Sequence, residues 1–115
     1  MASAKFPMSV ADKQQALFVK PLPAGDLVAL GRKYEQAGQL HDALDFYQAA
    51  QERPAVESLV AKAVETADLV LLLNACRAAG VEVSRQQFEA LRNKALETGK
   101  GSVAKRVSIL LAQAP

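Results

Sequence analysis

The residues with the chemistry for catalysis are few and far apart in this chain. Its 115 residues include one histidine, His41, and one cysteine, Cys76. His41 next to Asp42 has the parts of an acid–base pair, but a surface histidine in a turn explains the same pattern more simply. One His and one Cys are too few for a Cys/His metal site or a disulfide framework. The sequence therefore predicts a protein that is not an enzyme and needs no cofactor or metal.

The other reactive side chains in the middle of the chain also have structural interpretations. Cys76 lies in the apolar segment 69–79, where a free thiol packs as a small hydrophobic group. Asp42 and Asp45 follow the predicted start of a helix, where negative charge is favourable. We therefore expect Cys76 to be buried and the two carboxylates to stabilise a helix.

The run Thr98–Ser102 contains the residue types of a phosphate-binding loop but not its spacing. Lys100 is followed by glycine rather than Ser or Thr, and the run follows a predicted helix rather than a strand. We interpret it as a loop between helices. Weak anion binding is still physically reasonable at the start of the next helix, because helix N-termini present free N–H groups.

Charge is distributed unevenly along the chain, which carries a formal net charge of +2. Residues 24–84 hold an excess of acidic side chains, and residues 85–115 hold an excess of basic ones. These opposite charges can attract different partners or let two copies dock head to tail. The basic side chains of the last third are Arg85, Arg92, Lys94, Lys100, Lys105 and Arg106. They support an alternative function, weak binding of nucleic acid or an anionic surface, although no aromatic residues are interleaved to stack on bases.

Composition favours helices. The chain has 22 Ala and 15 Leu but two Thr and one Ile, and Ala and Leu are strong helix formers whereas β-branched residues favour strands. No apolar run is long enough to span a bilayer and no signal peptide is recognisable at the N-terminus, so we expect a cytoplasmic protein.

Helix start and stop signals divide residues 24–113 into six segments. We expect the first to begin at Asp26 as N-cap and to end at Gly38, and the second to run from about Leu40 until Pro54 stops it. Pro54 also suits the first turn of the third helix. The residues predicted to face inward in these three segments are Leu27, Leu30, Tyr34, Ala37, Ala43, Leu44, Tyr47, Ala50, Val56, Leu59, Val60, Ala63 and Val64.

The remaining three segments have clearer caps. Asp68 is the predicted N-cap of a helix over 69–79 that ends at Gly80, and Ser84 with Gln87 forms a capping box for the next one. Gly99 ends that fifth helix, and Ser102 is the expected N-cap of the sixth. Because segment 69–79 is apolar on almost all sides, we expect it to be a central core helix between the first and third hairpins; an exposed apolar patch is the less common alternative.

The first 23 residues are expected to form an N-terminal arm separate from a helical domain over 24–115. Ser9 can cap a short helix that Pro21 ends, and such a helix can cover the open end of the first hairpin. We expect residues 1–8 to be disordered. The predicted fold is all-α, with three antiparallel helical hairpins and a short N-terminal helix.

The first hairpin resembles a tetratricopeptide repeat. Small and aromatic residues follow that family's order over residues 24–54, with a degenerate match in the later hairpins. The matching residues are Leu30, Gly31, Tyr34, Gly38, Ala43, Tyr47 and Ala50. Gly38, Ala67 and Gly99 occupy equivalent positions at the ends of three helices. In packing terms, the small residues let two helices approach closely while Tyr34 and Tyr47 fill the wider gaps between them.

This resemblance implies that the three hairpins form a right-handed α-solenoid or a compact bundle. It also implies a non-catalytic adaptor or regulatory subunit that binds a peptide or partner helix in a groove. The groove is lined in such arrays by the first helix of each hairpin. The residues that point off the packed stripe of these helices here are Val28, Arg32, Glu35, Gln36, Glu57, Ala61, Glu65, Glu89, Asn93 and Glu97. The expected partner is another protein or a second copy in a homodimer. The five basic residues that we assign to the anion-binding alternative are Arg92, Lys94, Lys100, Lys105 and Arg106.

Overall fold

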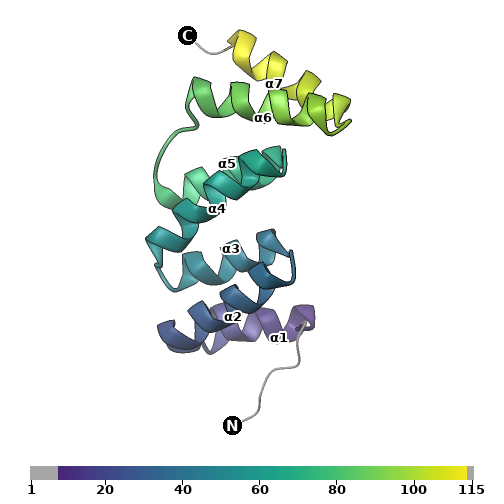
Figure 1. Cartoon of the computed structure of the whole chain (residues 1–115). Coiled ribbons are helices and arrows are strands. Elements are labelled where there is room, and N and C mark those ends of the chain that lie inside the picture. Colours follow the sequence, from purple (N-terminus) through teal and green to yellow (C-terminus); the bar gives the residue numbers. More distant parts are fainter. Residues whose placement is uncertain (1–7, 114–115) are drawn as a thin grey trace. The chain divides into compact units, whose positions relative to one another are not determined.

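The structure is a computed structural model that describes residues 8–113, and within that range every regular element is a helix (Figure 1). Six of the helices pack as neighbouring pairs joined by short turns, and a short helical segment precedes them. This confirms the all-α fold of three helical hairpins with an additional N-terminal helix. Among the described residues, no helix is long and apolar enough to cross a membrane. The disorder expected for residues 1–8 lies outside the described range except at Met8, which is ordered and donates its backbone N–H to the Tyr34 hydroxyl.

The chain divides into two compact units, Met1–Glu52 and Arg53–Pro115. In the first unit, α1 (Val10–Gln14) continues directly into the π-helix η1 (Gln15–Val19). The hairpin of α2 (Ala24–Gln36) and α3 (Leu40–Ala49) follows. The N-terminal segment is therefore part of the same unit as the first hairpin.

The second unit contains two hairpins. One is formed by α4 (Arg53–Glu65) and α5 (Leu69–Ala79), and the other by α6 (Arg85–Glu97) and α7 (Gly101–Gln113). Within this unit α4 packs against both α5 and α6. Six side chains of α5 are buried, as its apolar sequence predicted, but α4 rather than α5 is the helix that joins the two hairpins.

Three predicted caps are confirmed. The Ser9 hydroxyl accepts a hydrogen bond from the backbone N–H of Asp12, and the Asp68 carboxylate accepts one from Leu71. Ser84 and Gln87 form the reciprocal capping box. Each cap satisfies backbone donors that a helix start leaves without an intrahelical acceptor.

Two predicted caps are wrong by two or three residues. Helix α2 begins at Ala24, so Pro23 rather than Asp26 is its N-cap, and the Pro23 carbonyl accepts from Asp26 and Leu27. Proline fits there because its fixed φ, −55° here, matches the entry to a helix, while Asp26 places its charge in the first turn. Helix α7 likewise begins at Gly101, which puts Ser102 in its first turn.

The three equivalent helix ends share one backbone conformation. Gly38, Ala67 and Gly99 have φ values of 79°, 53° and 76°. A residue in this left-handed region ends a helix and turns the chain toward the next one. Gln51 and Gly80, which follow α3 and α5, also have positive φ values, so this conformation ends all five helices and does not distinguish the three positions that the sequence placed in register.

Among the described residues the core consists of apolar side chains and two tyrosines, Tyr34 and Tyr47, and no other polar or charged side chain is buried. Most predicted inward residues are buried, but Ala37 is exposed at the end of α2. Phe46, which the sequence analysis did not include, is completely buried. It lies three residues after Ala43, and the spacing of the α3 stripe was sufficient to identify it.

Strain at the end of α3 gives a first testable prediction. Gln51 is exposed and has a φ of 56°, which costs an L-residue energy that glycine avoids. We expect Gln51→Gly to raise the free energy of unfolding by about 0.5–1 kcal/mol, after allowing for the greater freedom of glycine in the unfolded chain. Urea denaturation measures the change.

The matched control is Gln48→Gly, a substitution of the same residue type at an exposed position inside α3. There glycine should lower stability by about 1 kcal/mol, because the backbone is already helical. A Gln51→Gly variant that is as destabilised as Gln48→Gly would contradict the strain at the helix end.

Candidate interaction surface

Gly31 of α2 lies directly against the ring of Tyr47 of α3. A Cβ atom on Gly31 would lie 2.5 Å from Cε1 and 2.7 Å from Cδ1 of the Tyr47 ring. Tyr47 is 1% exposed, and its hydroxyl donates a 2.6 Å hydrogen bond to Oε1 of Glu35. Glycine fits at position 31 because any side chain there would overlap the ring, which is buried and held at its hydroxyl by Glu35. Burial raises the pKa of Tyr47 well above its usual value of 10, and the hydrogen bond to Glu35 raises it further.

A second aromatic contact attaches the N-terminal segment to this hairpin. The rings of Tyr34 and Phe46 stack with centroids 5.4 Å apart and planes 13° from parallel. The Tyr34 hydroxyl accepts a 2.7 Å hydrogen bond from the backbone N–H of Met8. Ala16 and Leu17 of η1 are buried as well, so both polar and apolar contacts hold the segment.

Lys13 makes the strongest polar attachment of the N-terminal helix. Its ammonium group donates to Asp42 at 2.5 Å and to Asp45 at 2.7 Å, and it lies 5.9 Å from the centroid of the Phe46 ring. Burial by itself lowers the pKa of Lys13, but the two carboxylates outweigh that effect and the net pKa is raised. The three charged groups together carry a net charge of −1 at neutral pH.

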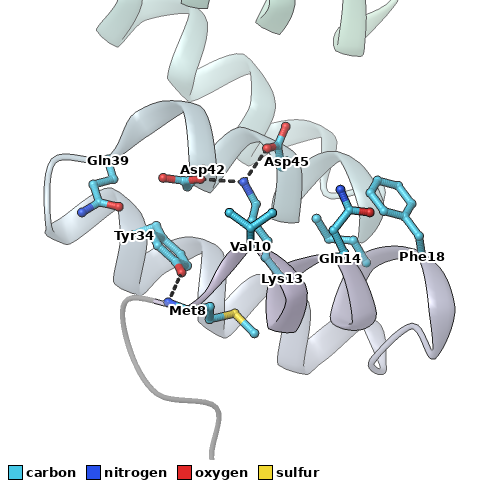
Figure 2. Close-up of a pocket in the computed structure, with 10 residues that line it drawn as sticks. Met8, Val10, Lys13, Gln14, Phe18, Tyr34, Gln39, Asp42 and Asp45 are labelled. Atoms are coloured by element: carbon cyan, nitrogen blue, oxygen red, sulfur yellow. Dashed lines mark hydrogen bonds and ion pairs between the residues drawn. The ribbon is translucent and has the colours of Figure 1, made fainter.

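A pocket of about 320 Å³ lies beside these charges, between the N-terminal helix and the hairpin (Figure 2). Three large apolar side chains of the N-terminal segment are exposed: Val10 by 79%, Phe18 by 69% and Val19 by 68%. Val10 and Phe18 line the pocket together with Gln14, Asp42 and Asp45. We call these five residues the pocket surface. It combines exposed apolar groups with a local excess of negative charge.

The sequence-predicted groove residues are divided between the two units. In α2, Arg32 and Gln36 are exposed and Val28 is half-buried. Glu35 is also half-buried, but its carboxylate accepts from Tyr47, which gives it a role in the packing of the hairpin. Arg32 and Gln36 are thus the α2 side chains that extend from the hairpin without this structural role.

The six predicted groove residues of the second unit are mostly exposed, and three of them form ion pairs on their own helices. Glu57 pairs with Arg53 at 3.6 Å, Glu89 with Arg85 at 3.2 Å, and Glu97 with Lys94 at 3.9 Å. Such exposed pairs contribute little to stability. Ala61, Glu65 and Asn93 are exposed on α4 and α6.

The predicted anion-binding residues do not act as one group of available charges. Lys94 is paired with Glu97, and the Lys100 ammonium donates a 2.7 Å hydrogen bond to the Thr66 carbonyl. Lys105 and Arg106 are exposed on α7, whereas Arg92 is half-buried on α6. The basic character of the second unit is therefore most accessible on α7.

The candidates for catalysis have the environments that their structural interpretations predicted. His41 is exposed in the first turn of α3, and Cys76 is 1% exposed, with burial raising the pKa of its thiol. A raised thiol pKa lowers the fraction of reactive thiolate. Among residues 8–113, no group of three or more His, Cys, Asp or Glu side chains is arranged to hold a metal ion.

Sequence reasoning missed the pocket surface. The spacing of Val10, Gln14 and Phe18, each four residues apart, places them along one side of a helix and was the available signal. The partners of Lys13 were not predictable in this way, because Asp42 and Asp45 are 29 and 32 residues further along the chain.

Comparison with known proteins adds no relative: no protein-family model, curated protein or solved structure matches this chain. The proposed function therefore rests on the geometry of the described residues.

The Gly31 contact gives a second prediction. Gly31→Ala should lower the free energy of unfolding by about 1–3 kcal/mol, because its methyl group would overlap the fixed ring of Tyr47. Gly25→Ala is the matched control, since it lies in the same helix with nothing within 4 Å of the new methyl group. That control should be neutral or slightly stabilising, because alanine is the better helix former. Equal stability of the two variants in urea denaturation would contradict the close approach.

The environment of Tyr47 gives a third prediction, on pH dependence. Because its folded pKa is raised above its unfolded value, the stability that its protonated form contributes is complete below about pH 10 and is lost as pH rises through the folded pKa. In a Tyr34→Phe variant, Tyr47 is the only tyrosine. Its tyrosinate absorbance should appear only at a pH well above 10, or together with unfolding.

The reciprocal variant, Tyr47→Phe, retains Tyr34 and serves as the control. Its stability should fall less steeply above pH 10 than that of the wild type, although the Lys13 contribution, also lost at high pH, remains. Reversible ionisation of Tyr47 near pH 10 in the folded protein would be inconsistent with its buried hydrogen bond.

Proposed function

We propose that this protein is a non-catalytic interaction module, an adaptor or regulatory subunit, that binds a helix of a partner protein at the pocket surface. The observation that carries the proposal is the pair of exposed apolar side chains, Val10 and Phe18, that line a pocket bordered by Asp42 and Asp45. A cytoplasmic location and a relation to tetratricopeptide repeat proteins remain parts of this proposal.

The apolar character of the surface supports binding rather than simple solvation. Single exposed hydrophobic residues are ordinary, but a contiguous apolar patch with polar neighbours is typical of an interaction site. Burial of Phe18 against a partner would remove a large aromatic surface from water, which makes it the candidate anchor residue.

The charges of the surface indicate the chemistry of the partner. Asp42 and Asp45 share one ammonium group, that of Lys13, so one negative charge remains uncompensated within this group. A basic side chain on the partner would complete the pairing. An amphipathic helix with an apolar residue next to Lys or Arg has this combination, and helices commonly bind through an apolar stripe in a groove.

The α2 face is the alternative position for the same activity. Arg32 and Gln36 are its exposed side chains, and the resemblance to tetratricopeptide repeats motivates the interpretation that they contact a peptide. This face lacks the large exposed apolar groups of the pocket surface. We therefore propose the pocket surface, rather than the α2 face, as the binding site.

The proposal is tested with substitutions that add charge to each surface while leaving the core intact. The full chain, immobilised, is used to capture proteins from host lysate at moderate salt. We expect Phe18→Glu to reduce retention of a specific partner at least tenfold, and Arg32→Glu combined with Gln36→Lys to have little effect. Circular dichroism verifies that each variant is folded.

The matched control is Val81→Glu, which introduces the same charge at an exposed apolar position in the second unit. It should retain the partner at the wild-type level. If Phe18→Glu retains the same proteins as the wild type, the pocket surface does not bind a partner. Loss of the partner only in the α2 variant would move the activity to that face. Retention of nucleic acid at low salt, lost on Lys105→Glu with Arg106→Glu, would favour the anionic-ligand alternative.

A further inference from the structure

The exposed side of α7 is chemically complementary to the pocket surface. Lys105, Arg106 and Ile109 are exposed, with Ile109 at 51%, while Ala104, Val107 and Leu111 on the same helix are buried. Spacings of three and four residues place Ile109 next to both basic side chains on one face. We call Lys105, Arg106 and Ile109 the α7 face.

We propose that the partner helix of the pocket surface is α7 of a second copy of this chain, so that copies associate head to tail. This inference rests on the proposed function, because it names the occupant of the same surface. In this contact Ile109 would pack near Val10 and Phe18, while Lys105 or Arg106 would pair with the carboxylates of Asp42 and Asp45.

Charge complementarity argues for a second copy as the occupant. Helix α7 carries two basic and no acidic side chains, whereas α3 carries Asp42 and Asp45 as its acidic residues and no Lys or Arg. Lys105 and Arg106 form no ion pair within the part of the chain that the structure describes, so both remain able to pair with an external carboxylate. A contact that joins an acidic apolar surface to a basic apolar surface gains both hydrophobic burial and favourable electrostatics.

The geometry of the contact has consequences for assembly. The pocket surface belongs to the first unit and the α7 face to the second, so each copy has one donor surface and one acceptor surface. A contact between two different surfaces is heterologous, and it adds copies until a ring closes or continues as an open chain. The smallest closed form is a ring of two copies, in which the pocket surface of each binds the α7 face of the other, whereas a contact between two pocket surfaces would not involve α7.

The decisive experiment uses purified full-length chains and sedimentation velocity over concentrations from about 1 µM to about 1 mM, which covers weak to moderate affinities. The wild type should form dimers or larger species as concentration rises. Phe18→Glu alters the pocket surface, and Ile109→Glu alters the α7 face. Each variant alone should associate at least tenfold more weakly than the wild type.

The mixture of these two variants distinguishes a head-to-tail contact from the alternatives. The intact pocket surface of Ile109→Glu can bind the intact α7 face of Phe18→Glu, but no further copy can be added. The mixture should therefore form a one-to-one dimer that neither variant forms alone. Arg106→Glu should weaken association of the otherwise wild-type chain and reduce its sensitivity to salt, because a charge pair is lost.

Val81→Glu is again the control and should assemble like the wild type. A wild type that remains monomeric at every concentration would overturn the inference. So would a mixture that remains monomeric, or association that depends on Phe18 but not on Ile109, which indicates a symmetric contact. In each case the lysate capture tests the proposed function separately. A different protein that the wild type captures and Phe18→Glu does not would support the pocket surface even if the chain does not self-associate.

Discussion

The contact between Gly31 and Tyr47 sets the geometry on which the rest of the first unit depends. It brings α2 and α3 so close that a single methyl group on Gly31 would overlap the aromatic ring. Glu35, four residues after Gly31 on α2, accepts a hydrogen bond from the Tyr47 hydroxyl, so the buried ring has little freedom to move away. With the two helices fixed at this separation, Tyr34 and Phe46 stack between them. The pocket is bordered by that same pair of helices, and its shape follows from their spacing.

The polar groups around this hairpin have more than one structural role. Asp42 lies in the first turn of α3, where its charge favours the helix, and both Asp42 and Asp45 bind the Lys13 ammonium. The two carboxylates therefore attach the N-terminal segment and give the pocket its acidic border, and Asp42 also stabilises α3. Removal of Lys13 would leave two neighbouring negative charges facing each other, which explains why its own pKa is raised in spite of burial.

Local patterns in the sequence predicted most of the fold, because the signals that start and end helices act within a few residues. Ser84 with Gln87 and Asp68 were identified from residue type and spacing alone, and the structure confirms both caps. The N-caps predicted at Asp26 and Ser102 were wrong, because several residue types can precede a helix and residue type alone does not decide among them. The structure has Pro23 as the N-cap of α2 and begins α7 at Gly101. The candidate site was predicted less well. Contacts between Lys13 and α3 join distant parts of the chain, and neither hydrophobic periodicity nor capping preference contains information about them.

The long sequence separation between Lys13 and its two carboxylate partners also affects the order in which the first unit folds. Hairpins such as α2 with α3 join neighbouring segments, and contacts of this kind form early because little chain entropy is lost in closing a short loop. The N-terminal segment is synthesised first, but Asp42 and Asp45 emerge only 29 and 32 residues after Lys13. During translation, α1 and η1 can therefore dock only after α3 has been synthesised. Val10 and Phe18 lie in the part of this unit that is synthesised first but docks last. Their exposed apolar side chains are therefore available for non-native contacts in the growing chain until α3 has formed.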